Sequence, residues 1–248
     1  MKGIILSAGM GTRLQPLTLN QPKCLVNVAG KPMMEYQLDA IEKAGIRECT
    51  IVVGFMADAV RDHFGSRYRG IDISYVENTD YASTNNLCSL WLAKDQFVDD
   101  ILLLESDLVF DDRLIARLVS LREPNIAVVD RFQSHMDGTV ILAEKDTAKS
   151  MVLKSDQSRW FNYSTALKTV NIYRLSKQSL SDLIVPEMES FLDDGRSDQY
   201  YEAVFASLIG SGRMEMCVMT TGNNKWAEID DIGDLRSAEE IFAPVSVR

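Results

Sequence analysis

GIILSAGMGTR, residues 3–13, opens the chain with a short apolar run that passes directly into a glycine-rich segment. The apolar run predicts a buried β-strand. Gly9 and Gly11 allow the backbone after this strand to approach a ligand closely, with N–H groups pointing toward it. The segment therefore has two interpretations, a loop that binds a phosphate-bearing ligand and an ordinary glycine turn.

Two well-known phosphate-binding loops do not fit this segment. A dinucleotide-binding loop leads directly into a helix, whereas Pro16 and Pro22 follow soon after Arg13. That loop also goes with an acidic residue at the end of the second strand, where this chain has Gly54 and Phe55. A P-loop requires Gly-Lys-Ser/Thr, which does not follow here. Any phosphate site at this loop is therefore of another kind.

Short apolar runs alternate with amphipathic stretches through the first half of the chain. The expected strands are 3–6, 50–53, 71–76, 101–104 and 126–129, and the expected helices are 33–44, 57–64, 86–97 and 113–121. Strands that are apolar on both faces and alternate with helices predict an α/β fold with a mainly parallel central sheet flanked by helices. Ligands bind such sheets beyond the carboxyl ends of the strands.

The second half of the chain predicts a different order of elements. Strand-like pieces at 139–143, 151–154 and 168–173 precede helical stretches at 177–192 and 199–208, a strand at 214–219 and a helix at 232–241. We expect these elements to extend the same sheet and to make it mixed. With no linker between the halves, we expect one domain over residues 1–248.

Composition excludes several classes of partner. The 248 residues carry a net charge of -10, which repels the phosphate backbone of nucleic acids and anionic membranes. No apolar run approaches the roughly 20 residues of a membrane span. The four cysteines fit neither a zinc spacing nor a dense disulfide framework. We expect a cytoplasmic protein with reduced thiols and without nucleic-acid or membrane partners; a homo-oligomer is compatible with the sequence.

Carboxylates must carry any metal chemistry, because the chain has only two histidines. The apolar run 101–104 ends in acid, which places Asp107 at the carboxyl edge of the sheet beside the glycine-rich segment. Asp230 lies in the alternating segment 226–231, where it shares one face with Glu228. Mg²⁺ prefers few carboxylates together with phosphate oxygens or water, so Asp107 and Asp230 are the predicted metal ligands. A structural role for Glu228 stays open, and Asp231 is the predicted cap of the last helix.

GMGTRLQPLT from residue 9 and PKCLV from residue 22 resemble the N-terminal signature of the sugar-phosphate nucleotidylyltransferase superfamily. The resemblance implies a Rossmann-like (GT-A-like) nucleotidyltransferase fold with Mg²⁺ as cofactor. It also implies that Arg13 neutralises the β- and γ-phosphates of an NTP and that Lys23 bridges the donor α-phosphate and the acceptor, as the two catalytic residues. Asp230 matches an acidic ligand of the family's Mg²⁺ site. The implied nucleotide-binding residues of the loop are Leu6, Ser7, Ala8, Gly9, Gly11, Thr12 and Arg13.

The segment 81–91 departs from the glycine-rich pattern of the sugar transferases. Its Thr-Asn-Asn, residues 84–86, resembles the choline-phosphate and phosphonate cytidylyltransferases of bacteria. Asparagine amides both donate and accept hydrogen bonds, which suits an aminopyrimidine edge. A capped helix start is the alternative, and both can hold together. The predicted contacts of CTP in this segment are Ser83, Thr84, Asn85 and Asn86.

Further segments, 135–140, 168–173, 198–202 and 226–231, resemble the cytidylyltransferase that acts on 2-aminoethylphosphonate. The acceptor-binding residues assigned on this basis are Lys23, Asp137, Asn171 and Glu202. The same resemblance divides the chain into an NTP-binding core to about residue 135, an acceptor-side elaboration over about 136–225, and a metal-site return with a C-terminal helix over about 226–248.

Two features bear on how an acceptor would be selected. Asp137 has two interpretations, a partner for an acceptor ammonium group and a residue of a Met-Asp-Gly turn. Five aromatic residues likewise form either a cation–π wall for a quaternary amine or ordinary core. These are Trp160, Phe161, Tyr173, Tyr200 and Tyr201.

The predicted function is Mg²⁺-dependent transfer of CMP from CTP to a small phosphonate or phosphomonoester, with release of pyrophosphate. The acceptor is 2-aminoethylphosphonate, a related phosphonate, or phosphocholine. One alternative is a sugar-1-phosphate nucleotidylyltransferase that uses UTP, dTTP or GTP. Another, from a different class, is a nucleotide-sensing module that binds an NTP without turnover.

Overall fold

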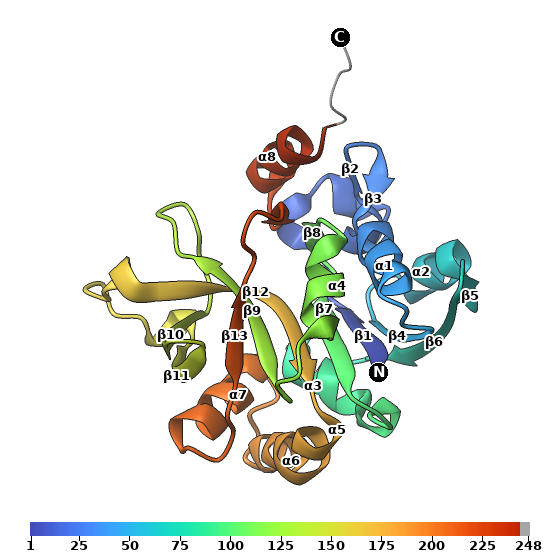
Figure 1. Cartoon of the computed structure of the whole chain (residues 1–248). Helices are drawn as coiled ribbons and strands as arrows, with labels where there is room; N and C mark the ends of the chain where they lie inside the picture. Colours follow the sequence, from blue (N-terminus) through green and yellow to red (C-terminus); the bar gives the residue numbers. More distant parts are fainter. Residues whose placement is uncertain (244–248) are drawn as a thin grey trace.

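A ten-stranded mixed sheet forms the centre of the molecule (Figure 1). The computed structural model describes residues 1–243. Along the sheet the strands lie in the order β10-β11-β13-β9-β12-β7-β1-β4-β6-β5. In chain order they are β1 (Lys2–Ser7), β4 (Glu48–Val53), β5 (Arg67–Tyr68), β6 (Ile71–Glu77), β7 (Ile101–Glu105), β9 (Ile126–Arg131), β10 (Val140–Glu144), β11 (Thr147–Val152), β12 (Ala166–Leu175) and β13 (Cys217–Thr220).

The strands of the first half pair as the apolar runs predict. β7, β1, β4 and β6 are parallel neighbours, and the predicted α/β architecture with a mixed central sheet is confirmed. On the other side of β7 the sheet is mostly antiparallel, because β12 runs antiparallel to both β7 and β9. The boundary between β7 and β12 therefore separates a parallel part of the sheet from a mixed part.

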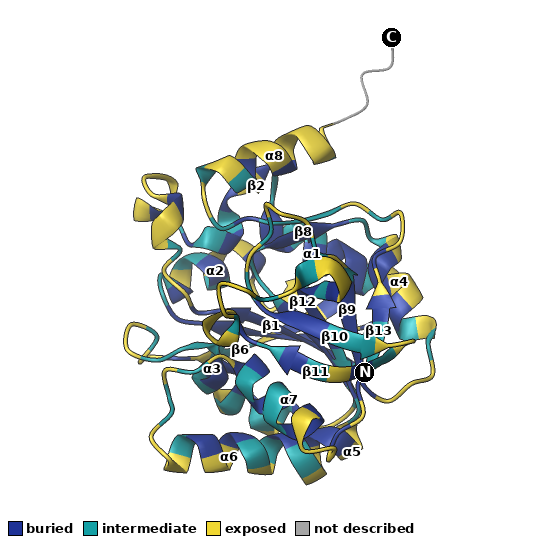
Figure 2. Ribbon diagram, turned by 90° about the vertical axis from the view of Figure 1, so that its left-hand side faces the viewer, coloured by how far each residue is buried: buried dark blue, intermediate teal, exposed yellow. Residues whose placement is uncertain are grey.

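Helices cover both faces of the sheet, because successive side chains of a strand point to opposite faces and both are buried. On β1, Ile4 and Leu6 pack into one apolar cluster and Ile5 into the other. The first cluster includes the helices α3 (Asn86–Leu92), α6 (Val185–Asp193) and α7 (Tyr201–Gly210), and the second includes α1 (Met33–Lys43), α2 (Ala57–Phe64) and α4 (Arg113–Ser120). Figure 2 shows buried strands beneath helices whose outer faces are exposed.

Several predicted boundaries were wrong. α3 ends at Leu92, and only a 3-10 turn, Lys94–Gln96, continues toward the predicted end. The helical stretch predicted at 177–192 is interrupted, because a π-helix over Leu180–Ile184 separates α5 (Lys177–Ser179) from α6. After Arg13 the chain forms only short 3-10 turns, Thr12–Leu14, Leu17–Leu19 and Lys23–Leu25, which agrees with the absence of a helix there.

Two small antiparallel pairs were not predicted from the sequence. β2 (Asn27–Val28) pairs with β3 (Lys31–Pro32), and β8 (Leu108–Phe110) pairs with β14 (Trp226–Glu228). These strands are too short for a periodic pattern. The second pair joins the segments that hold the two predicted metal ligands, since the backbone N–H of Ile229 donates to the carbonyl of Asp107 at 2.9 Å.

The C-terminal helix α8 (Ile232–Phe242) begins directly after this junction. The Asp231 carboxylate accepts from the N–H groups of Gly233 and Asp234, at 2.7 and 3.0 Å, and the Asp234 carboxylate accepts from the Asp231 N–H at 3.0 Å. This reciprocal cap confirms the predicted role of Asp231. No helix within residues 1–243 is long and apolar enough to cross a membrane.

Gly54 allows the ends of β1 and β4 to approach each other. A Cβ atom at Gly54 would lie 2.8 Å from the carbonyl oxygen of Ala8, and the N–H of Phe55 donates to that same oxygen at 3.0 Å. A dinucleotide-binding fold would have an acid at this end of the second strand. Here close packing against Ala8 requires glycine. It holds the glycine-rich segment against β4.

We expect Gly54→Ala to lower the free energy of unfolding by about 1–3 kcal/mol, because the backbone of Ala8 must move to admit the methyl group. Denaturant unfolding measures this change. Gly210→Ala is the control, since no atom lies within 4 Å of a Cβ atom at that helical position and alanine is the better helix former. Equal stability of Gly54→Ala and the wild type would contradict the packing argument.

Candidate active site

A cavity of about 1110 Å³ lies at the carboxyl ends of β1, β6 and β7 and extends toward β12. Most of the site residues predicted from the sequence line it; Ser7 and Ser83 do not. The predicted residues in the lining are Leu6, Ala8, Gly9, Gly11, Thr12, Arg13, Lys23, Thr84, Asn85, Asn86, Asp107, Asp137, Asn171, Glu202 and Asp230.

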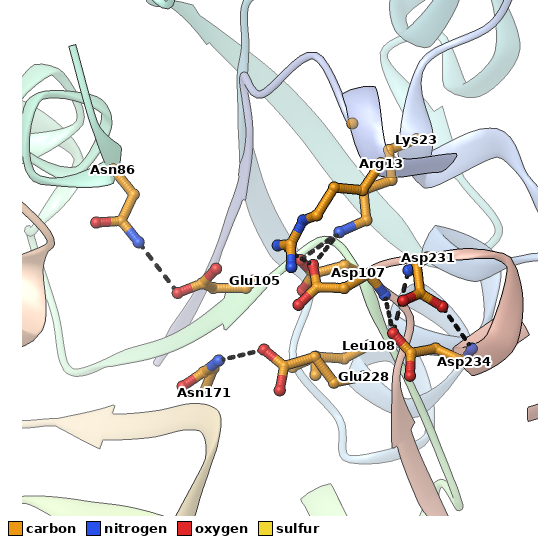
Figure 3. A network of polar contacts seen from close by, with 12 residues as sticks. Arg13, Lys23, Asn86, Glu105, Asp107, Leu108, Asn171, Glu228, Asp231 and Asp234 are labelled. Atoms are coloured by element: carbon orange, nitrogen blue, oxygen red, sulfur yellow. Dashed lines mark hydrogen bonds and ion pairs between the residues drawn. The ribbon is translucent and has the colours of Figure 1, made fainter. Parts of the chain in front are cut away.

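Lys23 lies between the two predicted metal ligands (Figure 3). Its Nζ atom donates to Asp107 Oδ2 at 2.8 Å and to Asp230 Oδ1 at 2.9 Å. Arg13 makes a further ion pair with Asp230 Oδ1 at 2.8 Å. Gly11 makes room for this arrangement, because it has a φ of +61° and a Cβ atom there would lie 2.9 Å from Lys23 Cβ. The glycine loop, both basic residues and both carboxylates thus form one cluster.

The charges of this cluster stabilise one another. Burial alone would lower the pKa of Lys23, but Asp107 and Asp230 outweigh burial and raise it above its ordinary value. Burial would likewise raise the pKa of Asp230, but Lys23 and Arg13 outweigh it, and the pKa of Asp230 lies below its ordinary value. Lys23 is therefore charged and Asp230 ionised near neutral pH.

The two carboxylates fit a hard cation that also binds phosphate oxygens. Asp107 Oδ1 is buried and has no hydrogen-bond partner among the described residues, so it offers an oxygen ligand next to Asp230. No group of three or more His, Cys, Asp or Glu side chains with metal-binding geometry occurs among residues 1–243. Two carboxylates are sufficient for Mg²⁺ when substrate phosphates and water supply the other ligands.

The asparagine pair begins α3, as the capping interpretation predicts. Asn85 Oδ1 accepts from the N–H of Asn86 at 2.8 Å. The Asn86 side chain donates to Glu105 Oε1 at 3.1 Å and accepts from the N–H of Tyr201 at 2.9 Å. Ser83 is exposed, and its hydroxyl donates to the carbonyl of Asp80 at 3.2 Å. Contacts between a nucleotide and this segment stay a prediction, and Ser83 has the weakest position for one.

Asn171 occupies a left-handed backbone conformation within β12, with a φ of +57°. Its side chain accepts from the Thr169 hydroxyl at 2.9 Å and donates to Glu228 Oε1 at 2.9 Å. Glu228 Oε2 also pairs with Lys168 Nζ at 3.1 Å. Glu228 thus contacts two buried groups of β12 next to the metal-ligand segment, as a structural role requires, and a direct role in the reaction stays a prediction.

Lys168, Glu105 and Glu228 were not assigned to the site from the sequence. Lys168 is 2% exposed, and its Nζ atom donates to the carbonyl of Thr169 at 2.7 Å. Glu105 accepts from Asn86 and, at 3.0 Å, from the hydroxyl of Tyr201. A lysine inside the apolar strand 168–173 was the one available signal for Lys168, because an unpaired buried charge is costly.

Glu202 is buried and Glu105 is half-buried, and their charges repel each other. Burial raises the pKa of Glu202 to about 7, since the charged form is poorly solvated there. Burial, followed by the charge of Glu202, raises the pKa of Glu105 well above its ordinary value. Glu202 is 4% exposed, and no described residue donates a hydrogen bond to its Oε2 atom. This part of the cavity therefore has more carboxyl groups than cations.

Asp137 does not lie free to meet an acceptor. It pairs with Lys154 Nζ at 2.5 Å, and its side chain is 72% exposed. The turn interpretation accounts for its position, because Gly138 follows with a φ of +100°. An ammonium-binding role for Asp137 would require this ion pair to open.

The five aromatic residues do not form a cation–π wall. Tyr173 and Tyr201 are fully buried and pack edge-to-face with each other, as the core interpretation predicts. Trp160 is 79% exposed, and of the five only Tyr200 lines the cavity. The five predicted residues therefore do not assemble an aromatic cage for a quaternary amine.

Residues 2–245 match the protein-family model described as nucleotidyl transferase. This chain belongs to that family. As a nucleotidyl transferase it is an enzyme that transfers a nucleotidyl group, and the predicted superfamily is confirmed.

Among its curated relatives, CMP-5'-(3-aminopropyl)phosphonate synthase of Streptomyces rubellomurinus is 34% identical over 98% of this chain and 39% of its own length. CTP:phosphoglutamine cytidylyltransferase of Campylobacter jejuni is 28% identical over 95% of this chain and 98% of its own length. 2-aminoethylphosphonate cytidylyltransferase of Lancefieldella rimae is 37% identical over 45% of each chain. The nucleotidyl transferase thus spans less than half of the first relative and nearly all of the second.

A solved structure agrees with this placement. CTP:phosphocholine cytidylyltransferase from Streptococcus pneumoniae superposes with a TM-score of 0.78 and 25% identity, over 97% of this chain and 98% of its own. A glucose-1-phosphate thymidylyltransferase of Bacillus anthracis has a TM-score of 0.81 at 18% identity, over 100% and 97% of the two chains. The second likeness concerns the fold alone.

We expect Glu202→Gln to stabilise the protein above pH 7 by on the order of 3–4 kcal/mol, because one pKa unit corresponds to about 1.4 kcal/mol. Folded Glu202 keeps its proton to about pH 7, whereas the ordinary value is 4.5. Unfolding therefore releases a proton in this range, and wild-type stability falls as pH rises from 4.5 to 7. The amide lacks this loss. Denaturant unfolding at several pH values measures the difference.

Glu187→Gln is a control with the opposite sign. Burial would raise the pKa of Glu187, but Ser207 and Arg213 outweigh burial and lower it. Its contribution to stability is present above its ordinary pKa and is lost as pH falls. If stability curves of Glu202→Gln and the wild type run parallel from pH 4 to 8, the raised pKa of Glu202 is wrong.

Proposed function

We propose that this nucleotidyl transferase transfers CMP from CTP to a small phosphonate or phosphate monoester with the help of Mg²⁺. The observation that carries the proposal is the cluster in which Arg13 and Lys23 contact Asp107 and Asp230 beside the glycine-rich loop. Several relatives are named for cytidylyl transfer or for amino- and choline-bearing acceptors. Their names support CTP as the nucleotide and this class of acceptor.

The proposed roles follow the layout of the cavity. Residues 1–135 would bind the nucleotide through the glycine loop and the segment 84–86. The strands and helices of 136–225 would hold the acceptor, and the segment from 226 would return Asp230 to the metal site. The last five residues of the predicted third part, 244–248, lie outside the described residues.

The reaction itself requires positioning more than covalent help. An oxygen of the acceptor phosphonate, already ionised near pH 7, attacks the α-phosphorus of CTP. A new O–P bond forms while the bond from the α-phosphorus to the bridging oxygen breaks, and pyrophosphate leaves. Arg13, which is largely exposed within the cavity, neutralises the leaving phosphates. Lys23 holds the acceptor anion beside the α-phosphate, and both contacts lower the cost of bringing two anions together.

Asp107 and Asp230 would hold Mg²⁺, which when bound supplies positive charge against the triphosphate as a Lewis acid. Lys23 now occupies the space between these carboxylates, so its ammonium group must shift toward the substrate anions as they arrive. Asp107 Oδ1, for which residues 1–243 provide no hydrogen-bond partner, would be one ligand of the cation.

We expect Asp107→Asn and Asp230→Asn each to lower pyrophosphate release by at least about 100-fold, a loss typical of removing one group that stabilises transition-state charge. Calorimetry of Mg²⁺ binding to the CTP-bound protein should show weaker binding, while circular dichroism shows an unchanged fold. Asp231→Asn is the matched control, since asparagine caps a helix as well as aspartate does. Near-normal turnover by both variants would reject the metal assignment.

A panel of nucleotides and acceptors tests the substrate class. CTP, UTP, dTTP and GTP are each combined with 2-aminoethylphosphonate, 3-aminopropylphosphonate, phosphocholine and glucose 1-phosphate, and pyrophosphate release is measured. We expect release with CTP and an acceptor from the first three. Release only with the sugar phosphate would establish the sugar-nucleotide alternative, and nucleotide binding without release would establish a sensing module.

A further inference from the structure

The proposal that follows rests on the proposed function and concerns the part of the acceptor that carries no phosphorus. The relevant part of the cavity lies beside the metal carboxylates, because β14 pairs Glu228 with Leu108, next to Asp107. Glu105 and Asn171 project into the same region (Figure 3). Glu202 lines it from the first turn of α7.

Almost every cation in the cavity lining already has a partner. Lys23 and Arg13 pair with Asp107 and Asp230. Lys154 pairs with Asp137, and Lys168 pairs with Glu228. Lys225, the remaining lysine of the lining, is exposed and donates to the carbonyl of Ile241 at 2.7 Å. Among the described residues, no side-chain cation forms an ion pair with Glu105 or Glu202.

The charge of Lys168 lowers the pKa of Glu202 without forming a salt bridge to it, although burial outweighs this effect. Glu105 and Glu202 differ in their hydrogen bonds. Glu105 Oε1 accepts from Asn86 and from the Tyr201 hydroxyl. Glu202 Oε2 is buried and has no hydrogen-bond partner in the part of the chain that the structure describes. The helix N-terminus favours an acid in the first turn, but this does not supply a hydrogen-bond donor to Oε2. A buried acceptor atom without a donor costs about 1–3 kcal/mol, so a group that supplies an N–H there restores the lost interaction.

We propose that Glu202, with Glu105 beside it, binds a primary ammonium group of the acceptor and makes the enzyme specific for amines that retain their N–H bonds. A primary ammonium brings both a positive charge and three N–H donors to these carboxyl groups. A trimethylammonium group brings the charge but no donor. Such a group is bound instead by several aromatic faces, and of the five aromatic residues considered above only Tyr200 lines the cavity, together with Tyr81 and Trp226.

This places the amine in the buried part of the cavity instead of at Asp137 on its rim. It also separates acceptors that are otherwise alike. Among phosphonates and phosphate esters with a short aminoalkyl tail, primary amines are favoured over choline-type tails, and tails ending in a neutral hydroxyl lack the charge.

Stepwise methylation of the amine tests the proposal. Pyrophosphate release with CTP is measured for 2-aminoethylphosphonate, for its N-methyl, N,N-dimethyl and N,N,N-trimethyl derivatives, and for 2-hydroxyethylphosphonate. We expect kcat/KM to fall with each methyl group. For the trimethyl compound it should be at least about 100-fold lower, since a site whose acceptors need N–H donors rejects ligands that lack them. Equal kcat/KM for the primary and trimethyl amines would overturn the proposal.

Glu202→Gln separates binding of the amine from a structural role. We expect kcat/KM for 2-aminoethylphosphonate to fall at least 10-fold and that for 2-hydroxyethylphosphonate to change less than 2-fold, because one charge contact is worth roughly this much. An equal loss for both acceptors would indicate a structural role and refute the proposal. Glu187→Gln, which removes a carboxylate of α6 outside the cavity lining, should leave both values unchanged.

Calorimetry distinguishes failure of this proposal from failure of the proposed function. The same five phosphonates are titrated into the CTP-bound protein. If no acceptor releases pyrophosphate, the proposed function is wrong, and tighter binding of the primary amine would still support the role of Glu202. Equal binding of all five compounds would overturn it, whatever the turnover.

Discussion

Two carboxylates that repel each other must lie side by side for the cavity to have its present form. Asp107 and Asp230 are 123 residues apart in the sequence, and the short β8–β14 pair brings them together. Lys23 offsets their repulsion by hydrogen bonding to both. Because the glycine at position 11 gives Lys23 its room, the loop, the lysine and the acids depend on one another. Removing any one of them weakens the contacts that hold the others in place.

The same part of the molecule carries an electrostatic cost. Buried charges are stable when they are paired and hydrogen-bonded, and Lys168 with Glu228 meets this condition. Glu202 does not, and its raised pKa expresses the cost of leaving a carboxyl group in a poorly solvated place. A binding site commonly retains such groups because a ligand can satisfy them. Glu202 lowers the stability of the free protein, and binding of the acceptor would supply the missing interaction.

Much of the fold could be predicted because burial leaves a periodic signal. The alternation of apolar runs with amphipathic stretches placed β1, β4, β6, β7 and β9 and the helices between them. The β8–β14 pair left no such signal, since three residues are too few to show a period. The end of α3 was missed because the residues after Leu92 continue in a 3-10 turn.

For the cavity, motifs identified the residues whose type and spacing are distinctive, such as Arg13, Lys23 and the two aspartates. They could not reveal which acids lack a partner. Glu202 and Asp137 look alike in sequence. The Oε2 atom of Glu202 is buried and has no hydrogen-bond partner within residues 1–243, whereas Asp137 pairs with a lysine at the surface. That difference depends on contacts between β12, α7 and the loop before β10, which are far apart along the chain.

The boundary between β7 and β12 has a consequence for how this enzyme family diversifies. On one side lie parallel strands whose ends carry the glycine loop; on the other lie β12 and its mostly antiparallel neighbours, with Lys168 and Asn171. If the nucleotide and the acceptor bind on opposite sides, mutations in one half need not disturb the other. New acceptors can then be recruited by altering residues 136–225, while the glycine loop, Lys23 and the two metal carboxylates are inherited intact.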